Sequence, residues 1–482
     1  MSASILTFFP PFLPSLKLLK SSMEMSVSMM ETEIRAVSNG LELIREGHAL
    51  GVKTAMRSLP FVFPMNHRRS ADLLEGYGEQ WEKVFSLLRK NCLGSLESIR
   101  QERAAELEFV DFLTEEPPPQ KWNTGEGAFK VLLDLPSLRL IDISRDTSHR
   151  IQNYTVVFAP RAGHNSNIVE RVSLYMRDHG LTRIAIVEQK CADEIPLVIN
   201  GEKHREDFNS QVSQYKEILE YLKQATGFPA HLVAICQPGP LLMSALILNP
   251  HLGKTFGSAG SPMDTEGERG FLTDFARTMG ENFIDVLTYL YKHRVPEGKP
   301  GEGRDAYDGR AHVLGFYFLG KDQHTRNLRK LLTDLKTGNK AGAERQKVFY
   351  HWYNTVNHLP VDFIKDTFKK VFLRNELVRG TLTISGRRIS IEDYPASVPI
   401  WALGGRKDDI TPPLQATGHM RLLRSVPERD KLTLLCDGGH MGLFRSSEIL
   451  KNFYSRIVEF MLSHSDWAET QEKTSPILPP QI

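Results

Sequence analysis

The sequence predicts an α/β fold: a mostly parallel central sheet with helices on both faces and one large, mostly helical insertion. Short apolar runs recur between amphipathic helical segments, which is typical of strands that are buried on both faces. This alternation stops near residue 264 and returns near residue 395. The chain has 482 residues, of which 41% are hydrophobic, and this is enough for a large buried core.

The first part of the sheet is predicted from apolar segments that each end at a turn. "NYTVVFAP" is the first of these strands, and it precedes a helical pattern in "NIVERVSLYMRDHG" and a second strand in "TRIAIVE". Residues 208–226 then repeat apolar side chains at helical spacing, and Gly227 is available as the stop. The predicted buried face of this helix consists of Phe208, Val212, Tyr215, Ile218, Leu219 and Leu222. The strand "HLVAIC" follows and ends at Cys236.

The last part of the chain resumes the same alternation. "SVPIWALGG" is a predicted strand, "PLQATGHMRLLRSV" a helix, "KLTLLCDGGH" a strand and "SEILKNFYSRIVEFMLS" the final helix. We therefore expect a helical N-terminal extension, two halves of an α/β core around an insertion, and a flexible tail. The expected bounds are 1–120 for the extension, 121–263 and 395–466 for the two halves of the core, 264–394 for the insertion and 467–482 for the tail.

Composition excludes several classes of partner. The 60 basic and 58 acidic residues are evenly mixed, so neither a nucleic acid nor an anionic membrane is expected to bind. No run of about 20 apolar residues predicts a transmembrane span. Four widely spaced cysteines without a CxxC pair favour a reducing, cytoplasmic setting. Neither HExxH nor paired Cys/His spacing occurs, so no metal and no cofactor are expected.

Cys236 lies where the chain is expected to turn most sharply. A strand that ends in a nucleophile, then a tight turn and a helix is the plan of the nucleophile elbow. On this interpretation Cys236 is the nucleophile and the N–H of Gln237 is one oxyanion donor. Ala234 and Pro238 occupy positions that are usually glycine, and proline is unusual there. The alternative is that Cys236 is an inert buried thiol.

Two further turns carry the residues that a cysteine nucleophile needs. "WALGGRKDDITPP" places an acidic turn after one strand, and "LLCDGGHMGLF" places a histidine between glycines after the next. Nucleophile, acid and histidine follow strands in this order in such sheets, which predicts a triad of Cys236, Asp408 and His440. Asp409 is the alternative acid. His440 would take the proton of Cys236 while the acid holds its tautomer.

A second oxyanion donor is expected from the turn after an earlier strand, "APRAGHNS". Gly163 and His164 lie in this turn. The sequence does not decide which backbone group donates there, and His164 is either a substrate contact or an ordinary turn residue.

The segments "AICQPGPLLMSALIL", "SPMDT", "GRKDDIT" and "GGHMGLF" resemble the intracellular poly(3-hydroxybutyrate) depolymerases with a cysteine nucleophile. The resemblance extends from "VVFAPRAGHNSN" to the final helix, roughly the last two-thirds of the chain. It implies an α/β-hydrolase fold with a helical cap, and the same triad of Cys236, Asp408 and His440. Pro-Gly-Pro-Leu-Leu after Gln237 and Met441 after the histidine depart from the family pattern.

The resemblance implies hydrolysis of polyester ester bonds through a thioester acyl-enzyme. The partner would be a polyhydroxyalkanoate polymer or oligomer at the surface of a cytoplasmic storage granule. The aromatic-rich insertion would then form an apolar cleft, or merely its own core. A polyhydroxyalkanoate synthase, another thiol-dependent acyltransferase or thioesterase, and an inactive granule protein stay open as alternatives. Synthases more often keep Gly-x-Cys-x-Gly, which is missing here, and no oligomeric state is predicted.

Overall fold

The structure is a computed structural model that describes residues 13–62, 67–124, 129–145, 151–161 and 166–468. These residues form two compact units. One unit contains Pro117–Lys321 and His351–Ile482, and the other contains Ala3–Glu116 and Asp322–Tyr350. Each unit is described by itself below.

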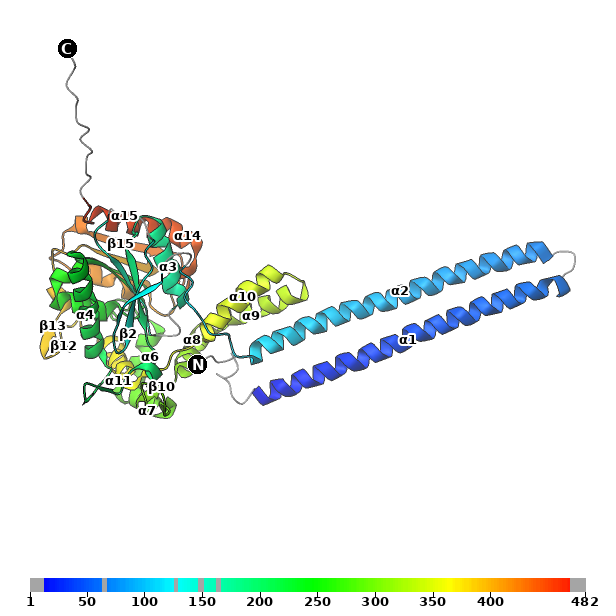
Figure 1. The fold of residues 1–482 in the computed structure, drawn as a ribbon, viewed down its shortest axis with the longest axis horizontal. Coiled ribbons are helices and arrows are strands. Elements are labelled where there is room, and N and C mark those ends of the chain that lie inside the picture. The colour runs from blue at the N-terminus through cyan, green and yellow to red at the C-terminus, as the bar shows by residue number, and fades with distance from the viewer. Residues whose placement is uncertain (1–12, 63–66, 125–128, 146–150, 162–165, 469–482) are drawn as a thin grey trace, which may run out of the picture. The chain divides into compact units, whose positions relative to one another are not determined.

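The larger unit is built on an eight-stranded sheet (Figure 1). Its strands, in chain order, are β1 (Lys130–Asp134), β2 (Leu138–Asp142), β3 (Thr155–Phe158), β4 (Ile184–Gln189), β7 (Ala230–Ile235), β8 (Gly253–Ala259), β14 (Ile400–Gly405) and β15 (Lys431–Cys436). Their spatial order is β1-β2-β4-β3-β7-β8-β14-β15. Only β2 runs opposite to its neighbours in this sheet, because it pairs antiparallel with both β1 and β4. This is the sheet of an α/β-hydrolase fold, as the sequence predicts.

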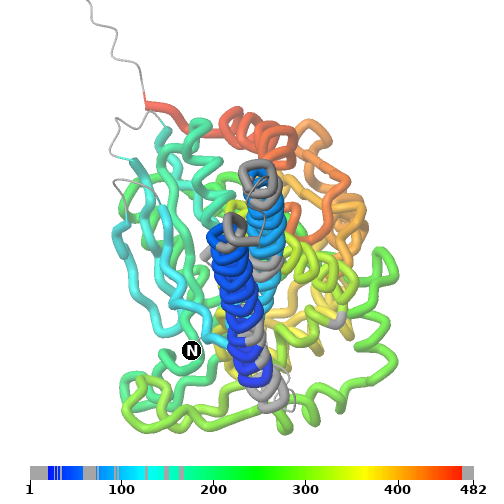
Figure 2. The backbone as a smooth tube through the Cα atoms, turned by 90° about the vertical axis from the view of Figure 1, so that its right-hand side faces the viewer, coloured from blue at the N-terminus to red at the C-terminus, as the bar shows by residue number. Residues whose placement is uncertain are grey.

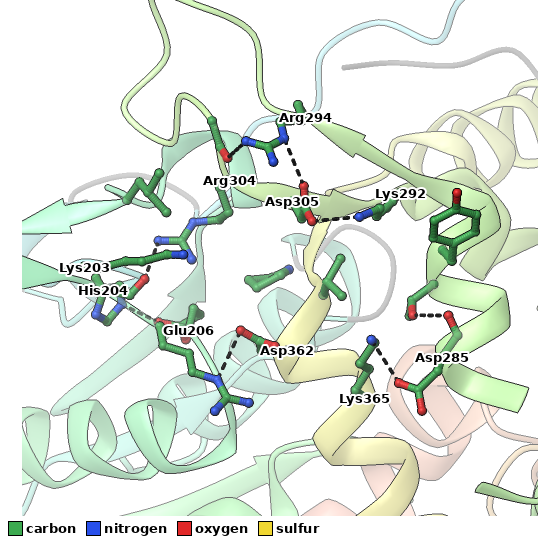
Figure 3. A pocket seen from close by; sticks show the side chains of 17 residues that line it. Lys203, His204, Glu206, Asp285, Lys292, Arg294, Arg304, Asp305, Asp362 and Lys365 are labelled. Carbon is green, nitrogen blue, oxygen red and sulfur yellow. Dashed lines mark hydrogen bonds and ion pairs between the residues drawn. The ribbon is translucent and has the colours of Figure 1, made fainter. Parts of the chain in front are cut away.

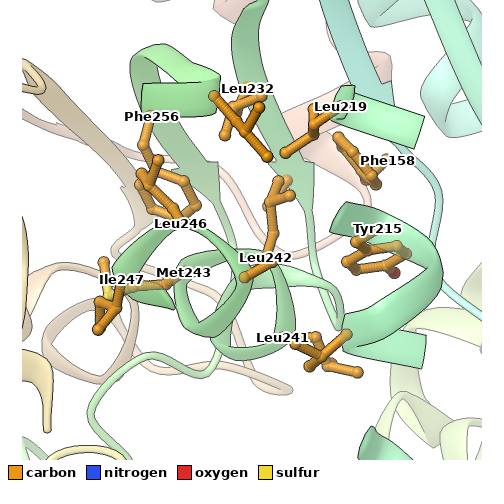
Figure 4. Packing of buried hydrophobic residues seen from close by; sticks show 14 of the residues in the cluster. Phe158, Tyr215, Leu219, Leu232, Leu241, Leu242, Met243, Leu246, Ile247 and Phe256 are labelled. Carbon is orange, nitrogen blue, oxygen red and sulfur yellow. The ribbon is translucent and has the colours of Figure 1, made fainter. Parts of the chain in front are cut away.

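Helices cover both faces of the sheet. The crossovers are α3 (Ser166–Asp178) from β3 to β4, α4 (Phe208–Thr226) from β4 to β7, and α5 (Gly239–Leu248) from β7 to β8. Alternate strand residues such as Phe158 and Leu232 belong to one core cluster with the apolar face of α4 and with α5. Figure 4 shows these side chains of α4 and α5 meeting those of the strands. The intervening residues, such as Val157 and Val233, are also fully buried, so the opposite face is covered too.

The predicted face of α4 is confirmed. All six apolar residues predicted to be inside are buried, and Gln211 and Gln214 are buried beside them. Asp207 begins the helix by accepting a hydrogen bond from the N–H of Ser210, and Gly227 ends it in a left-handed conformation with φ 80°.

Small strands and helices separate β8 from β14. In the larger unit they are α6 (Phe271–Met279), α7 (Glu281–Tyr291), β9 (Lys292–Arg294), β10 (Asp305–Tyr307), α8 (Gly309–Leu319), β11 (Leu359–Pro360), α11 (Val361–Asp366), β12 (Leu382–Ile384) and β13 (Arg387–Ile389), together with a π-helical turn over Thr367–Leu373. β9, β10 and β11 form a small antiparallel sheet that the sequence does not predict. Two further strands, β5 (Val198–Ile199) and β6 (Glu202–Lys203), form a hairpin after β4.

The regular elements that the structure describes in the smaller unit are all helices. α1 (Leu13–Val62) and α2 (His67–Thr114) run side by side as a long antiparallel pair in both views (Figures 1 and 2), and α9 (Lys321–Lys336) and α10 (Lys340–Asn354) form a second pair. Ion pairs join the two pairs: Lys336 contacts Glu102 at 2.8 Å and Glu106 at 2.6 Å. Within the described residues, no helix has an apolar stretch that could cross a bilayer.

The predicted helix over "PLQATGHMRLLRSV" is wrong. The chain forms only α12 (Pro413–Thr417) and a 3-10 turn over Gly418–Arg421 before it turns toward β15. Thr417 and Gly418 are both poor helix formers, and their low propensity coincides with the end of the α-helix.

The last helical segment is confirmed but is not one regular helix. Residues 447–463 form α14 (Ser447–Ile449), a π-helical turn over Leu450–Tyr454 and α15 (Ser455–Ser463), and a short helix that was not predicted, α13 (Gly442–Arg445), precedes them. Residues 469–482 of the predicted flexible tail lie outside the described part of the chain.

Close packing between β8 and β14 gives a first test. Trp401 of β14 is fully buried and is the cross-strand partner of Gly257, where a Cβ atom would overlap the indole ring. We expect Gly257→Ala to lower the free energy of unfolding by about 1–3 kcal/mol, because the strands or the indole must shift. Denaturant unfolding measures this. Gly315→Ala is the control: Gly315 is an exposed residue of α8 with open space around it, so this variant keeps the parent's stability or gains up to about 1 kcal/mol. Equal stability of Gly257→Ala and the parent would contradict the packing described.

Candidate active site

Cys236 lies directly after β7, at the point where the strand order of the sheet reverses. β4 lies on one side of β3 and β7 on the other, and open α/β sheets bind ligands beyond the carboxyl ends of their strands at such a reversal. The backbone of Cys236 is left-handed, with φ 61°, and its N–H donates to the carbonyl oxygen of Ala259 over 2.9 Å. A residue with a Cβ in this region carries strain of roughly 1–2 kcal/mol. The sharp turn predicted at this cysteine is therefore present.

The close approach after the turn depends on Gly239 rather than on Pro238. A Cβ atom at Gly239 would lie 2.5 Å from Sδ of Met263 and 2.6 Å from Cβ of Ser261, so only glycine fits there. α5 begins at Gly239 and points its N-terminal end toward this turn, which favours negative charge near Cys236. Pro238 instead occupies the N-cap position with helical backbone angles.

Asp408 is held by the turn that follows β14. Its Oδ1 accepts hydrogen bonds from the N–H groups of Ile410 at 3.0 Å and Thr411 at 2.8 Å. These bonds leave Oδ2 free to face another partner. Asp408 is buried, whereas Asp409 is exposed to solvent. The structure thus brings Asp408, and not Asp409, into the site.

His440 lies between Asp408 and Cys236. Its Nδ1 is 2.8 Å from Oδ2 of Asp408, and its side chain interacts electrostatically with that of Cys236. The edge-to-face ring of Phe444, with centroids 5.5 Å apart, packs beside the imidazole. A backbone bond from the N–H of Lys407 to the carbonyl oxygen of Gly438, 3.1 Å long, joins the acidic turn to the histidine turn. The three predicted side chains therefore meet in one place.

Electrostatics favour the charged form of His440. Burial by itself lowers the pKa of this imidazole, but the negative charges of Asp408 and Cys236, with hydrogen bonds to both, raise the pKa well above the usual histidine range. A positively charged imidazole between a carboxylate and a cysteine side chain is the arrangement that a cysteine nucleophile needs. Chemically, such a group of residues can form and release an acyl thioester.

Gln237 lies where an oxyanion donor is expected. Among the described residues its backbone N–H has no acceptor, so this donor is available to a ligand. Its side-chain Oε1 accepts a hydrogen bond from the N–H of Arg161 over 2.9 Å. Gly163 and His164, the other predicted oxyanion region, lie outside the described residues.

Arg161 is a positioning residue that sequence reasoning missed. Its guanidinium is buried, pairs with Glu206 at 2.9 Å, and donates to Gln211 at 2.9 Å and to the carbonyl oxygen of Lys190 at 3.1 Å. Burial by itself raises the pKa of Glu206, but His204 and Arg161 hold it below its ordinary value. The sequence does show an arginine directly after a buried strand. A side chain with several hydrogen-bond donors at that position can anchor the turn beside Gln237.

The large polar pocket of the structure is a different feature. Its volume is about 570 Å³, and most of its lining side chains are charged, as Figure 3 shows. Ion pairs such as Lys292 with Asp305 and Lys365 with Asp285 neutralise many of these charges. None of Cys236, Asp408 and His440 lines this pocket.

Comparison with known proteins adds family information for the second half of the chain. Residues 260–465 match the family described as PHB de-polymerase C-terminus. This match covers fewer than half of the 482 residues and supports a hydrolase of ester bonds related to poly(3-hydroxybutyrate) depolymerases. It includes Asp408 and His440 but begins after Cys236. The identity of the nucleophile therefore depends on the geometry and not on this match.

Solved structures with a similar fold were also found. A monoacylglycerol lipase from Paleococcus ferrophilus is 14% identical, with a TM-score of 0.38 and coverage of 68% of this chain and 99% of that one. A thermophilic esterase from Thermogutta terrifontis is 8% identical, with a TM-score of 0.36 and coverage of 70% and 98%. At these scores we draw nothing further from them. No curated protein matches the chain.

Thiol reactivity tests the environment of Cys236 without assuming a function. Burial raises the pKa of the Cys191 and Cys436 thiols, whereas Cys236 lies beside a charged imidazole. Cys191 and Cys236 are both half-buried, and Cys436 is buried. At pH 7, iodoacetamide should label Cys236 at least about tenfold faster than Cys191 or Cys436. Peptide-resolved mass spectrometry of the folded protein measures the three rates.

The contribution of His440 to the reactivity of Cys236 can be measured with a variant. His440→Ala should slow labelling of Cys236 toward the rates of Cys191 and Cys436, because the imidazole charge is lost. His251→Ala, at an exposed histidine, is the matched control and should change nothing. Equal labelling of Cys236 in both variants would show that His440 does not activate the thiol.

Proposed function

We propose that this protein is an intracellular depolymerase that hydrolyses the ester bonds of a polyhydroxyalkanoate such as poly(3-hydroxybutyrate). The observation that carries the proposal is the contact of Cys236, His440 and Asp408 on three turns at one edge of an α/β-hydrolase sheet. The match of residues 260–465 to the PHB depolymerase C-terminus supports the substrate class. The polymer or oligomer would be met at a granule surface in the cytoplasm.

The first step forms the acyl-enzyme. The sulfur of Cys236 attacks the ester carbonyl carbon, a C–S bond forms, and the carbonyl oxygen becomes an oxyanion. The N–H of Gln237 donates to this oxyanion from the turn that Arg161 anchors. The C–O ester bond then breaks, and the imidazolium of His440 gives its proton to the departing alkoxide. The products of this step are a thioester on Cys236 and a free hydroxyl end of the polymer.

The second step regenerates the thiol. Neutral His440, held through Nδ1 by Asp408, takes a proton from water, and the resulting hydroxide attacks the thioester carbonyl. The C–S bond breaks, Cys236 leaves as a thiolate beside protonated His440, and the released carboxylic acid gives its proton to solvent. Asp408 stabilises the imidazolium in both steps because its carboxylate is buried and fixed by two backbone donors.

Turnover on amorphous poly(3-hydroxybutyrate) granules tests the proposal directly. We expect the parent to release soluble hydroxyacid or short oligomers and Cys236→Ala to release none above background, because the attacking sulfur is gone. Chromatography of the products measures both. Cys191→Ala is the matched control and should keep the parent's rate. Unchanged turnover in Cys236→Ala would refute the mechanism, and CoA release with polymer growth from hydroxybutyryl-CoA would favour a synthase instead.

The adjacent aspartates provide a matched pair of variants. Asp408→Asn should lower kcat/KM by roughly 10²- to 10⁴-fold, because the amide neither stabilises the imidazolium nor holds the required tautomer. Asp409→Asn, at the exposed neighbour, should stay within about twofold of the parent. Steady-state kinetics on a soluble hydroxybutyrate oligomer measures both, and the reverse ranking would move the acid to Asp409.

The raised pKa of His440 predicts the alkaline limb of the pH profile. The imidazolium is needed to protonate the alkoxide, so activity is present below the pKa of His440 and is lost as pH rises through it. Because that pKa is raised, the alkaline fall of kcat/KM should occur at a pH well above the ordinary histidine pKa of about 6.5. Asp408→Asn removes a charge that raises the pKa, so its limb should move to lower pH. A limb that does not move would show that Asp408 does not stabilise the imidazolium.

A further inference from the structure

Asp193, His293 and His358 form a cluster of possible metal ligands that the proposed mechanism does not use. One ligand atom from each of these three residues lies within 4.8 Å of the other two. Asp193 lies in the 3-10 turn Ala192–Glu194 after β4, His293 in β9, and His358 directly before β11. All three belong to the larger unit, and Asp193 and His358 are buried.

The small sheet explains why the two histidines meet. His293 of β9 lies opposite Ala306 of β10, which in turn lies opposite Pro360 of β11. His358 precedes Pro360 by two residues, so both imidazoles are on the same face of the sheet. Lys292 and Arg294, the neighbours of His293, lie on the other face and line the polar pocket of Figure 3. The cluster is therefore separate from that pocket.

Backbone hydrogen bonds hold Asp193 against this face. The N–H of Ala192 donates to the carbonyl oxygen of His358 over 2.9 Å, and the N–H of Gly301 donates to the carbonyl oxygen of Asp193 over 2.9 Å. Ala192 also packs with Val295 and Ala306 in a small apolar cluster on the same face. These contacts hold the turn that carries Asp193 against the face of the small sheet that carries His293 and His358.

An independent observation indicates a missing partner. The Asp193 residue is only 7% exposed, and its Oδ1 is buried without a hydrogen bond from any described residue. A buried carboxylate oxygen without a donor typically costs about 1–3 kcal/mol or more, so such oxygens usually bind an ion or water.

We propose that Asp193, His293 and His358 bind one Zn²⁺ ion. Two imidazole nitrogens and one carboxylate oxygen are a common zinc ligand set, and a water molecule would complete a tetrahedron. Zinc lies about 2.0–2.2 Å from such ligands, which requires ligand atoms about 3.4 Å apart. The present spacing of up to 4.8 Å needs only small side-chain rotations to close.

The surroundings of His358 specify how it would bind. Its Nδ1 accepts from the N–H of Gly309 over 3.2 Å and lies 3.6 Å from Oδ1 of Asp308. Nε2 is therefore the nitrogen left for zinc. With zinc on Nε2 the ring proton would be on Nδ1, so Nδ1 would give up the bond from Gly309 and donate instead to the Asp308 carboxylate. A carboxylate behind a zinc-bound histidine is a recurrent arrangement that raises ligand basicity.

The proposed ion joins the core to the insertion. Asp193 follows a strand of the central sheet, while His293 and His358 belong to the segment between β8 and β14. Zinc would thereby stabilise the inserted strands against the core. No metal is expected from the sequence, because these ligands are far apart along the chain and show none of the short spacings typical of zinc motifs.

Zinc titration of the full-length, metal-stripped protein tests the proposal. Isothermal titration calorimetry should show one equivalent of Zn²⁺ bound, and thermal unfolding should shift upward by a few degrees with saturating Zn²⁺. Asp193→Asn and His293→Ala should each weaken Zn²⁺ binding about 100-fold or more. His293 is only half-buried, so its variant keeps the assay informative if an exchange at a more buried ligand unfolds the protein.

Two controls separate this site from other zinc ligands. Cys236→Ala must retain the bound equivalent, because Cys236 and His440 could themselves hold zinc. Exposed His251→Ala must retain it as well. Co²⁺ bound at the proposed site should show no thiolate-to-metal charge-transfer absorption. The proposal is overturned if no equivalent binds, if Cys236→Ala abolishes binding, or if Asp193→Asn and His293→Ala bind Zn²⁺ like the parent.

The Asp308→Asn variant separates an effect on zinc affinity from an effect on the stability of the fold. Asp308→Asn keeps a side chain able to cap α8, which Asp308 now does by accepting from the N–H of Arg310 over 2.9 Å. It should nevertheless weaken Zn²⁺ binding roughly 10- to 100-fold without changing the thermal unfolding of the metal-free protein. Unchanged zinc affinity would contradict the assignment of Nε2 as the ligand.

Discussion

The left-handed backbone at Cys236 is the constraint on which the candidate site depends. A φ of 61° at a residue with a Cβ is unfavourable, so the surrounding structure must hold it in place. The bond from its N–H to Ala259 fixes one side, and the close fit of Gly239 against Ser261 and Met263 fixes the other. The turn presents a thiol above the sheet, and beside it the amide N–H of Gln237 has no acceptor among the described residues. The strained backbone at Cys236 thus places its thiol next to the amide of Gln237.

Burial and charge act together around this turn. His440 is enclosed, and enclosure alone would favour its neutral form, yet the carboxylate of Asp408 and the thiol of Cys236 favour the charged one. Asp408 can play this part because two backbone N–H groups satisfy its other oxygen. A second buried ion pair, Arg161 with Glu206, anchors the neighbouring turn by the same principle. These buried charges have partners, whereas Oδ1 of Asp193 has no hydrogen-bond donor among the described residues, and this contrast supports the proposed zinc site.

Much of the core could be predicted from the sequence because its pattern is local. The buried face of α4 and the strands on either side of it follow from apolar spacing, and all were confirmed. The helix over residues 413–426 was not, since Thr417 and Gly418 end the α-helix within a pattern that looks helical. That Cys236, Asp408 and His440 lie close together was predicted from their order along the chain, each on a turn after a strand, and their catalytic role stays a proposal. Gly163 and His164 stay a prediction.

The sequence by itself determined the class of sheet, the turn at Cys236 and the order of the candidate residues, because periodicity and turn residues act over a few neighbours. Only the tertiary structure decided between Asp408 and Asp409, since burial and the reach to His440 depend on how two turns approach each other. It also placed Arg161 beside Gln237 and gathered Asp193, His293 and His358 from distant segments. Such contacts join residues far apart in the chain, and no local pattern records them.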